Sequence, residues 1–248
     1  MNNFELEVCI ESVESALAAK RGGATRLEVC ADLVIGGTTP GLCLYDEIRK
    51  NCDIKMHMLI RPRYGDFLYT EHEFAIMKNA IIRFRESGAE GVVIGMLKKD
   101  GTLDKERMRE LIACAGDMRV TLHRAFDVCR EPYEALETAI DLGVDTILTS
   151  GQQNSAKEGI ELLTKLVERS AGRIEIMPGS GVNAEIIKEL YERTGATAYH
   201  MSGRMVYDSK MEYRKAGVSM GIPTISEYEL GITDEEKIHN ARKVLEAL

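Results

Sequence analysis

Residues 5–9 (ELEVC) recur almost unchanged as residues 26–30 (RLEVC), and this repeat decides the fold prediction. In an extended strand alternate residues share a face, so each copy places Leu and Val on one side and Glu and Cys on the other. A short helix fits the residues between the copies, over 12–20. We therefore expect two neighbouring strands that pack Leu and Val against helices and turn Glu and Cys towards a shared interior.

The same alternation of apolar runs and helical periods continues along most of the chain. Capping boxes at Thr70–Glu73 and Ser155–Glu158 predict two of the helix starts. Eight strands alternating with helices predict an α/β fold of the (β/α)8 or TIM-barrel class, as a single domain over residues 1–248. A doubly wound open sheet is the alternative, but the usual G-x-G-x-x-G turn after the first strand is missing. The strands are expected to begin near Phe4, Thr25, Lys55, Gly91, Arg119, Asp145, Arg173 and Ala198, with helices over 12–20, 43–51, 71–87, 104–115, 132–142, 155–170 and 183–194.

Residues 203–232 interrupt this pattern, because they show no clean helical period before a last helix opens at 233–236. A loop of this length inside a compact fold usually has a function. One interpretation is a packed extension or a subunit contact, and we expect a homo-oligomer on that basis. The other interpretation is a cover over the mouth of the barrel.

The composition restricts the class of protein. The net charge is −8 and the basic residues are scattered, which argues against a nucleic-acid-binding face. No apolar run approaches the roughly 18 residues needed to cross a membrane, and the N-terminus lacks the pattern of a signal peptide. The six cysteines form no CxxC pair, so we expect reduced thiols and a cytoplasmic protein.

Polar residues occupy inward positions on several predicted strands, and the active sites of such barrels lie at the carboxyl ends of the strands. Burying charged groups without partners is costly, so a convergent set of them indicates a functional site rather than ordinary core. Glutamates suit a general base, histidines suit a general acid, and an arginine can stabilise developing oxyanion charge. The candidate catalytic residues are Glu28, Arg61, His123, Glu175 and His200.

Glycine-rich turns after the last strands indicate that the site binds an anion. Residues 178–183 (PGSGVN) lead into a capped helix, and loops seven and eight of these barrels often hold a phosphate on backbone N–H groups. Arg61 and Arg63 could also clamp a carboxylate or phosphate, although pairing with Glu28 or Asp66 would only hold their loop. The candidate anion-binding residues are Arg63, Ser150, Gly151, Gly179, Ser180, Gly181 and Gly203.

Several of these stretches also resemble the CutC family, which is named for copper homeostasis. The matching stretches are RLEVC (26–30), GGTTP (36–40), IRPRYGDF (60–67), HRAFD (123–127), LTSG (148–151) and GSGV (179–182). The resemblance covers residues 1 to about 204. It implies a (β/α)8 barrel, a cytoplasmic location and a role in copper handling. The tail beyond residue 204 matches less securely, and nothing is carried over to it.

Copper handling would require soft ligands, since Cu(I) prefers thiolates and thioethers. Cys9 and Cys30 would lie close together if the first two strands are neighbours in matching register, with Met177 or a histidine as a third ligand. A hard divalent metal ion is another possibility, because such ions prefer oxygen ligands. Its candidate ligands are Glu7, Glu28, Glu175 and His200.

Three functions therefore remain open. The first is a copper-homeostasis protein that binds Cu(I) near Cys30 and Cys9. The second is an acid/base enzyme, of isomerase, aldolase or lyase type, that acts on a small anionic, phosphorylated or sugar-like molecule. The third is an inactive barrel that works as an interaction scaffold.

Overall fold

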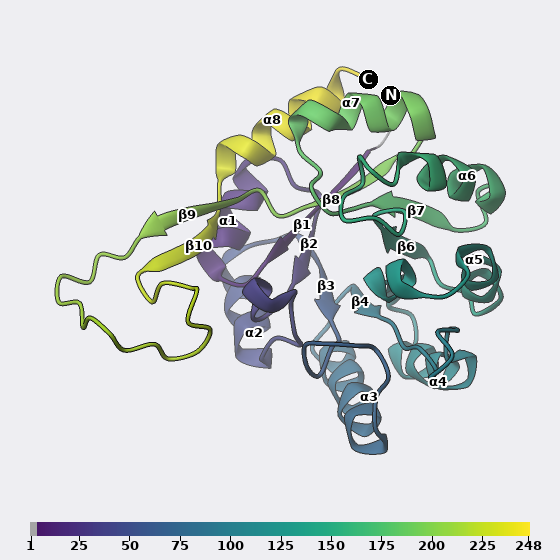
Figure 1. Ribbon diagram of the computed structural model, residues 1–248, viewed down its shortest axis with the longest axis horizontal. Helices are drawn as coiled ribbons and strands as arrows, with labels where there is room; N and C mark the ends of the chain where they lie inside the picture. Colours follow the sequence, from purple (N-terminus) through teal and green to yellow (C-terminus); the bar gives the residue numbers. More distant parts are fainter. Residues whose placement is uncertain (1–3) are drawn as a thin grey trace.

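Parallel strands form the wall of a nearly closed barrel, and helices surround it (Figure 1). The structure is a computed structural model and describes residues 4–248. The hydrogen-bonded order is β7-β6-β5-β4-β3-β2-β1-β8, so β8 returns beside β1 and the predicted α/β barrel is confirmed. The strands are β1 (Glu5–Ile10), β2 (Arg26–Val29), β3 (Lys55–Leu59), β4 (Gly91–Ile94), β5 (Arg119–Leu122), β6 (Thr146–Thr149), β7 (Glu175–Pro178) and β8 (Ala198–Met201). The helices are α1 (Val13–Arg21), α2 (Leu42–Asn51), α3 (Glu71–Glu86), α4 (Lys105–Ala115), α5 (Pro132–Asp141), α6 (Ile160–Ser170), α7 (Ala184–Thr194) and α8 (Glu235–Glu246).

The two LEVC copies pack as their alternation predicts. Leu6 and Val8 of β1, like Leu27 and Val29 of β2, are fully buried in the main hydrophobic core, which they share with residues of the surrounding helices. The intervening polar residues face the inside of the barrel, where Glu7 is fully buried. Burial on both faces of the strands is the usual condition of a parallel sheet.

The register of the first two strands differs from the matching one considered above. Glu7 pairs with Arg26, and Cys9 pairs with Glu28 rather than with Cys30. This two-residue offset follows from the tilt of strands in a closed barrel, which staggers each strand against the next. Cys9 and Cys30 nevertheless lie in one small apolar cluster at the top of the barrel.

A glycine of β4 and the glycine that directly follows this strand make room inside the barrel for two histidine rings. A Cβ atom on Gly91 would lie 2.4 Å from the ring of His57, and one on Gly95 would lie 2.5 Å from the ring of His123. Both distances are far below van der Waals contact, so any larger residue would displace a ring. Gly91 and Gly95 therefore fix where these two imidazoles lie.

The helix predicted over 155–170 begins later than expected. Ser155 and Glu158 do make the two hydrogen bonds of a capping box, at 3.2 and 3.3 Å, but α6 starts at Ile160. A Cβ atom on Gly159 would lie 1.8 Å from the carbonyl oxygen of Ser150. This close approach of two backbones holds residues 156–159 in a turn ahead of the helix.

Residues 204–233 form a hairpin arm, built on the antiparallel strands β9 (Arg204–Asp208) and β10 (Glu229–Thr233). The arm projects sideways from the barrel beyond α1 (Figure 1). Its base is anchored, because Thr233 N donates to Ser15 Oγ at 3.1 Å and Asp234 N donates to Gly203 O at 2.9 Å. The interpretation of this segment as a cover over the mouth is therefore wrong. The segment leaves the barrel instead of folding back over it.

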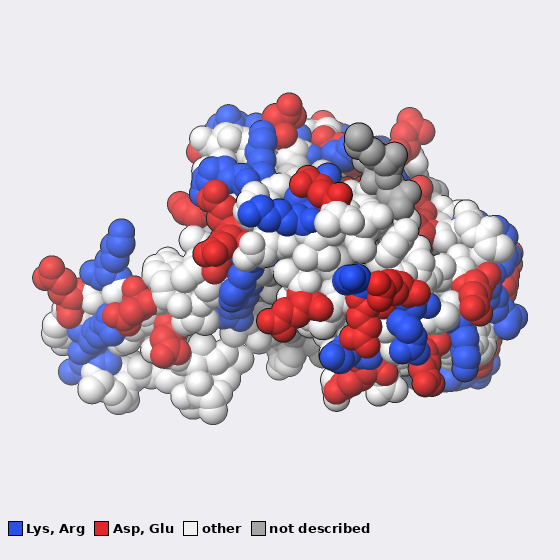
Figure 2. All heavy atoms as spheres, turned by 90° about the horizontal axis from the view of Figure 1, so that it is seen from above, with Lys and Arg blue, Asp and Glu red and all other residues white. Residues whose placement is uncertain are grey.

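Charges of both signs are mixed on the surface. On the face shown in Figure 2, Lys and Arg alternate with Asp and Glu and leave no continuous basic patch. Within residues 4–248, no helix is both long enough and apolar enough to cross a bilayer. The signal-peptide prediction rests partly on residues 1–3, which lie outside the described residues.

Candidate functional site

A cavity of about 280 Å³ opens at the carboxyl ends of the strands, where the active sites of such barrels are found. Apolar side chains of Leu33, Leu59, Phe67 and Leu148 form part of its wall. No residue beyond Ser202 lines it. The predicted site residues that line it are Cys9, Glu28, Cys30, Arg61, His123, Ser180, Gly181 and His200.

Glu7 lies beneath this cavity and contacts one side chain from each of the two strands that flank β1. One carboxylate oxygen accepts a hydrogen bond from Arg26 Nε at 2.6 Å, and the other lies 2.8 Å from His200 Nδ1. Burial alone would raise the pKa of Glu7, but the charge of Arg26 and the hydrogen bond from His200 outweigh it and hold the pKa well below its ordinary value. Glu7 is therefore a permanent buried anion.

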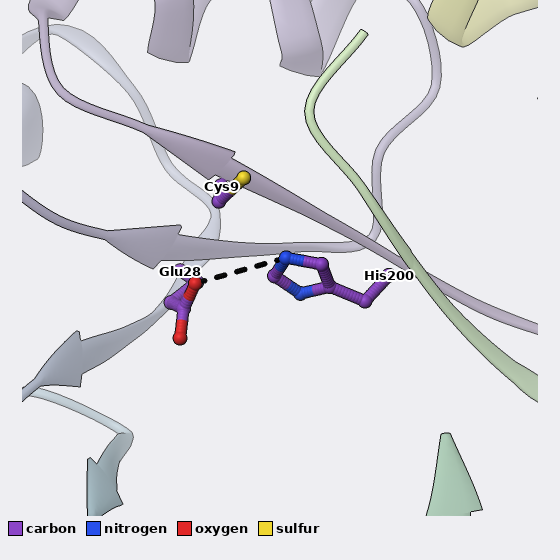
Figure 3. Close-up of side chains that lie close together, drawn as sticks. All are labelled: Cys9, Glu28 and His200. Atoms are coloured by element: carbon purple, nitrogen blue, oxygen red, sulfur yellow. Dashed lines mark ion pairs between the residues drawn. The ribbon is translucent and has the colours of Figure 1, made fainter. Parts of the chain in front are cut away.

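His200 carries the effect of Glu7 into the cavity. Its Nδ1 faces Glu7, while its Nε2 lies 3.8 Å from Glu28 Oε2 (Figure 3). Burial would lower the pKa of His200, but Cys9, Glu7 and Glu28 raise it well above its ordinary value. The imidazole is thus held as a cation at neutral pH, with Nε2–H directed at the cavity residues.

Glu28 is shifted in the direction opposite to Glu7. Burial, followed by the like charge of Glu7 among the causes that raise it, moves the pKa of Glu28 upward. Its carboxyl oxygen also lies 3.5 Å from Cys30 Sγ. Burial and the neighbouring Glu28 carboxylate raise the pKa of Cys30 well above its ordinary value, so Cys30 is a thiol.

Three of these side chains could share a metal ion. One ligand atom each from Cys9, Glu28 and His200 lies within 4.8 Å of the others, and the three side chains converge from β1, β2 and β8 (Figure 3). Cys30 stands beside Glu28 at the same end of the cavity. The group combines soft sulfur and imidazole donors with one hard carboxylate.

Arg61 and His123 lie at another corner of the cavity. Arg61 donates from Nη1 to the carbonyl oxygens of Gly36 (2.9 Å) and Gly37 (3.0 Å), and from Nη2 to that of Gly65 (3.0 Å). The expected pair between Arg61 and Glu28 is not among the ion pairs of residues 4–248. Burial, together with the charge of Arg61, lowers the pKa of His123 to about 3, so this imidazole is neutral.

Glu175 does not join the others. It opens β7, pairs with Thr146 in the sheet and accepts a hydrogen bond from the Thr146 hydroxyl at 3.1 Å. That position is the amino end of the strand, so Glu175 lies at the opposite end of the barrel from the cavity. The alternation along the strand predicts that the Glu175 side chain faces the barrel interior. Its position along the barrel axis depends on the residue at which β7 begins.

Most of the predicted anion-binding residues are occupied in holding loops. Ser150 is fully buried and bonds to Asp127, while Gly151 packs against Gly159. Arg63 pairs with Glu73 at 2.6 Å and Asp66 at 3.0 Å. Gly179 packs against Leu148 and Gly203 against Ile238, so only Ser180 and Gly181 of this set line the cavity.

Arg26 is the important residue that the sequence prediction omitted. It is 1% exposed and holds both Glu7 and Glu5, the latter at 3.3 Å. The signal was present, because RLEVC places Arg26 on the same strand face as Glu28 and Cys30. The second LEVC copy thus supplies three inward polar groups rather than two.

Comparison with known proteins identifies the family. The model of the CutC family matches residues 4–205, from the start of the barrel to the start of β9. This chain belongs to the CutC family. The copper homeostasis protein cutC homolog of Homo sapiens is 43% identical, over 98% of this chain and 89% of its own length. A CutC family protein of Parabacteroides distasonis is 48% identical, over 94% of this chain and 97% of its own length.

The CutC structure from Streptococcus agalactiae supports the fold. It superposes with a TM-score of 0.76 at 30% identity and covers 79% of this chain and 97% of its own. The resemblance to the CutC family seen in the sequence motifs is therefore confirmed. The chain belongs to a family that is named for copper homeostasis. Substitutions of the cavity residues of this chain can therefore test how a CutC protein works.

We predict that Glu7→Gln lowers the free energy of unfolding by about 3–5 kcal/mol, because it removes the fully buried counter-charge of Arg26 and leaves only the more distant, partly exposed Glu5. Urea denaturation at neutral pH measures this loss. The exposed Glu47, paired only with Lys50 at the surface, provides a matched control, and Glu47→Gln should change stability by no more than about 0.5 kcal/mol.

The effect should depend on pH with a definite sign. The pKa of Glu7 in the folded protein lies below its ordinary value of 4.5, so its stabilising contribution is present above that pH and is lost as pH falls below it. The difference between the wild type and Glu7→Gln should therefore narrow in acid. An unchanged difference across this range would contradict the assigned role of Glu7.

Proposed function

We propose that the cavity binds one Cu(I) ion through Cys9, Cys30 and His200. The observation that carries this proposal is the convergence of Cys9, Glu28 and His200 within 4.8 Å, with Cys30 beside them. Two thiols and an imidazole form a donor set that suits Cu(I). Membership of a copper-homeostasis family supports the same choice of ion.

Glu28 has a different part in this site. A carboxylate is a poor ligand for a soft cation, and the raised pKa of Glu28 favours its protonated form. Its contact with Cys30 Sγ instead keeps that sulfur in position. Cys30 and the charged His200 must each lose a proton to bind a metal ion, the latter from Nε2, so binding releases protons from this corner of the cavity. The six free thiols fit a reducing compartment, and we propose the cytoplasm as the place of action.

Anaerobic titration with Cu(I) against a competing chelator tests this proposal. Loss of outer partners alone weakens metal sites by about 10–100-fold, so Cys9→Ser combined with Cys30→Ser should reduce affinity by at least about 100-fold. The exposed Cys43 is a matched control, and Cys43→Ser should leave affinity unchanged. Equal affinity of the double variant and the wild type would exclude this site.

We propose an acid/base enzyme as the second candidate, because the carboxyl group in the cavity, Glu28, and the one beneath it, Glu7, have opposite pKa shifts. The pKa of Glu7 is lowered and that of Glu28 is raised, while His200 bridges the two. Such separation is a common arrangement for acid/base catalysis. A raised pKa brings Glu28 closer to neutral pH, where proton transfer next to a carbonyl group is most effective. The cavity also has room for a small molecule.

This candidate predicts proton exchange next to a carbonyl group. Incubation with dihydroxyacetone phosphate or pyruvate in heavy water, followed by proton NMR, should show exchange that Glu28→Gln abolishes. Glu175→Gln is the matched control, since Glu175 lies at the other end of the barrel and its loss should leave the rate unchanged. Exchange that survives in Glu28→Gln would exclude the enzyme proposal.

Absence of both copper binding and ligand binding would favour the third function, an inactive barrel that works as an interaction scaffold.

We also propose that the hairpin arm, residues 204–233, docks against a second copy of the chain. Its exposed apolar side chains include Met211, Tyr213 and Met220, the last 82% exposed. A two-stranded hairpin is at most marginally stable alone, so a partner surface would stabilise it. The arm carries four basic and four acidic residues, so it approaches a second copy of net charge −8 without repulsion.

Shortening the arm tests this contact. Asp208 pairs with Glu229, so residues 209–228 can be replaced by a two-residue Asn-Gly turn that closes the hairpin. Analytical ultracentrifugation should find an oligomer for the wild type and a monomer for the shortened chain. The control Lys210→Ser removes an exposed charge and should retain the oligomer. Equal mass for the wild type and the shortened chain would refute the contact.

A further inference from the structure

Arg61 is a buried cation that no acidic side chain neutralises. It is only 9% exposed, and within residues 4–248 no carboxylate lies within 4 Å of its guanidinium. The three acceptors that hold it are main-chain carbonyl oxygens, which fix the side chain but carry no net charge. An isolated buried charge is unfavourable unless something binds to it.

The guanidinium also has donor capacity to spare. It has five N–H groups, and the three hydrogen bonds to carbonyl oxygens leave two without an acceptor in the described chain, that of Nε among them. The Tyr69 hydroxyl is buried beside Arg61, which contacts it closely enough to lower its pKa, but within the described residues it makes no hydrogen bond of good geometry. Burial nevertheless raises the pKa of Tyr69 to about 12, so this hydroxyl is neutral and leaves the charge of Arg61 uncompensated.

His123 adds a third unused donor from the opposite side. Its Nδ1 accepts a hydrogen bond from Ala125 N at 3.1 Å, so the neutral ring carries its proton on Nε2. Nε2 is buried and has no partner. The edge of the ring that holds Nδ1 and Cε1 packs on Gly95, so the ring cannot turn to satisfy Nε2 elsewhere.

Phe67 joins these groups into one corner of the cavity. Its ring lies 5.2 Å from the Arg61 guanidinium and 4.9 Å from the His123 ring. Phe67, Arg61 and His123 all line the cavity. Within residues 4–248, five buried side-chain atoms lack a hydrogen bond of good geometry, and three of them, on Arg61, Tyr69 and His123, gather around this corner. Buried polar groups are normally satisfied, so such a cluster calls for a ligand.

We infer that the corner formed by Arg61, Tyr69 and His123 binds the carboxylate of a small organic acid. A planar carboxylate matches two N–H groups of a guanidinium and leaves oxygen lone pairs for the imidazole and the hydroxyl. Water could satisfy the neutral groups but would not neutralise Arg61. The ring of Phe67 shifts to admit the carboxylate group. The carboxylate then replaces its hydrogen bonds to water by hydrogen bonds to three buried donors.

The charge of the corner selects a monoanion. Arg61 supplies one positive charge, and Arg124, the next arginine of the cavity, is already paired with Asp127 at 2.7 Å. A phosphate dianion would keep an uncompensated charge there. The rest of the acid lies along Leu59 and Leu148, towards Glu28 and His200, and the cavity volume of about 280 Å³ limits it to a short chain.

Ligand-observed NMR on the full-length, metal-free protein tests this site. The probes are acetate, pyruvate and lactate, each compared with its neutral amide. We expect the acids to bind and the amides not to bind, since the amides lack the charge that Arg61 requires. Because acetate is little more than the carboxylate itself, failure of all three acids to bind would overturn the inference, as would equal binding of the amides.

Two variants assign the binding to this corner. Arg61→Lys keeps the charge but loses the planar fork and should weaken pyruvate binding by about tenfold or more, whereas Arg63→Lys, two residues along the same loop, should not. Tyr69→Phe removes a hydroxyl that makes no hydrogen bond of good geometry within the described residues, so the loss of a ligand contact predicts weaker pyruvate binding. Unchanged binding in both Arg61→Lys and Tyr69→Phe would refute the site.

The carboxylate site stands independently of the copper proposal. Repeating the pyruvate titration with Cys9→Ser and Cys30→Ser combined should give unchanged affinity, because the hydrogen bonds that hold Arg61 go to main-chain carbonyl oxygens and not to either thiol. Loss of copper binding together with retained pyruvate binding separates the two sites. Loss of pyruvate binding in the thiol variant would place the acid elsewhere and contradict the assignment to Arg61.

Discussion

The buried carboxylate of Glu7 is the group on which the rest of the site depends. It lies inside the barrel, fully removed from solvent, and is stabilised there by Arg26 and His200. Each partner belongs to a strand adjacent to β1, so one anion ties together three strands near the seam of the barrel. The charge of Glu7 also shifts the pKa values of two groups above it: it helps to hold His200 charged and pushes Glu28 towards its neutral form.

This arrangement explains why thiols, acid and imidazole coexist in one small volume. Two ionised carboxylates side by side would repel each other, but a cationic His200 between them screens Glu7 from Glu28. The raised pKa of Glu28 also reduces the share of its charged form that Cys30 faces. The cavity end at β1, β2 and β8 therefore presents sulfur and nitrogen donors without accumulating negative charge.

The sequence was sufficient to predict the barrel, because the evidence for it is local. Alternation in LEVC fixes which side chains face inward, and the helix periods fix the order of elements. Quantities that depend on several strands together were out of reach. The stagger that puts Cys9 beside Glu28 arises from barrel closure, and the low position of Glu175 depends on where β7 begins.

The unpartnered donors around Arg61 are a second feature that the sequence could not predict. IRPRYGDF reveals two arginines with similar surroundings in sequence, yet Arg63 meets Glu73 and Asp66 while Arg61 meets only carbonyl oxygens. The difference comes from the loop at residues 36–37, which is distant in sequence and folds over Arg61. A donor is unused when the folded chain brings no acceptor close to it. This property can be seen only in the structure and not in the sequence.

The two proposed ligands share one cavity, so their binding must be linked. Cu(I) held by two thiolates and a neutral imidazole is more negative than the two thiols and the charged His200 that it replaces, so bound copper would disfavour a carboxylate at Arg61. Thermodynamic linkage makes this influence reciprocal, so the organic acid would weaken copper binding by the same factor. The two ligands would therefore oppose each other across the cavity, and the charge on His200, set by Glu7, is the quantity that changes when copper binds.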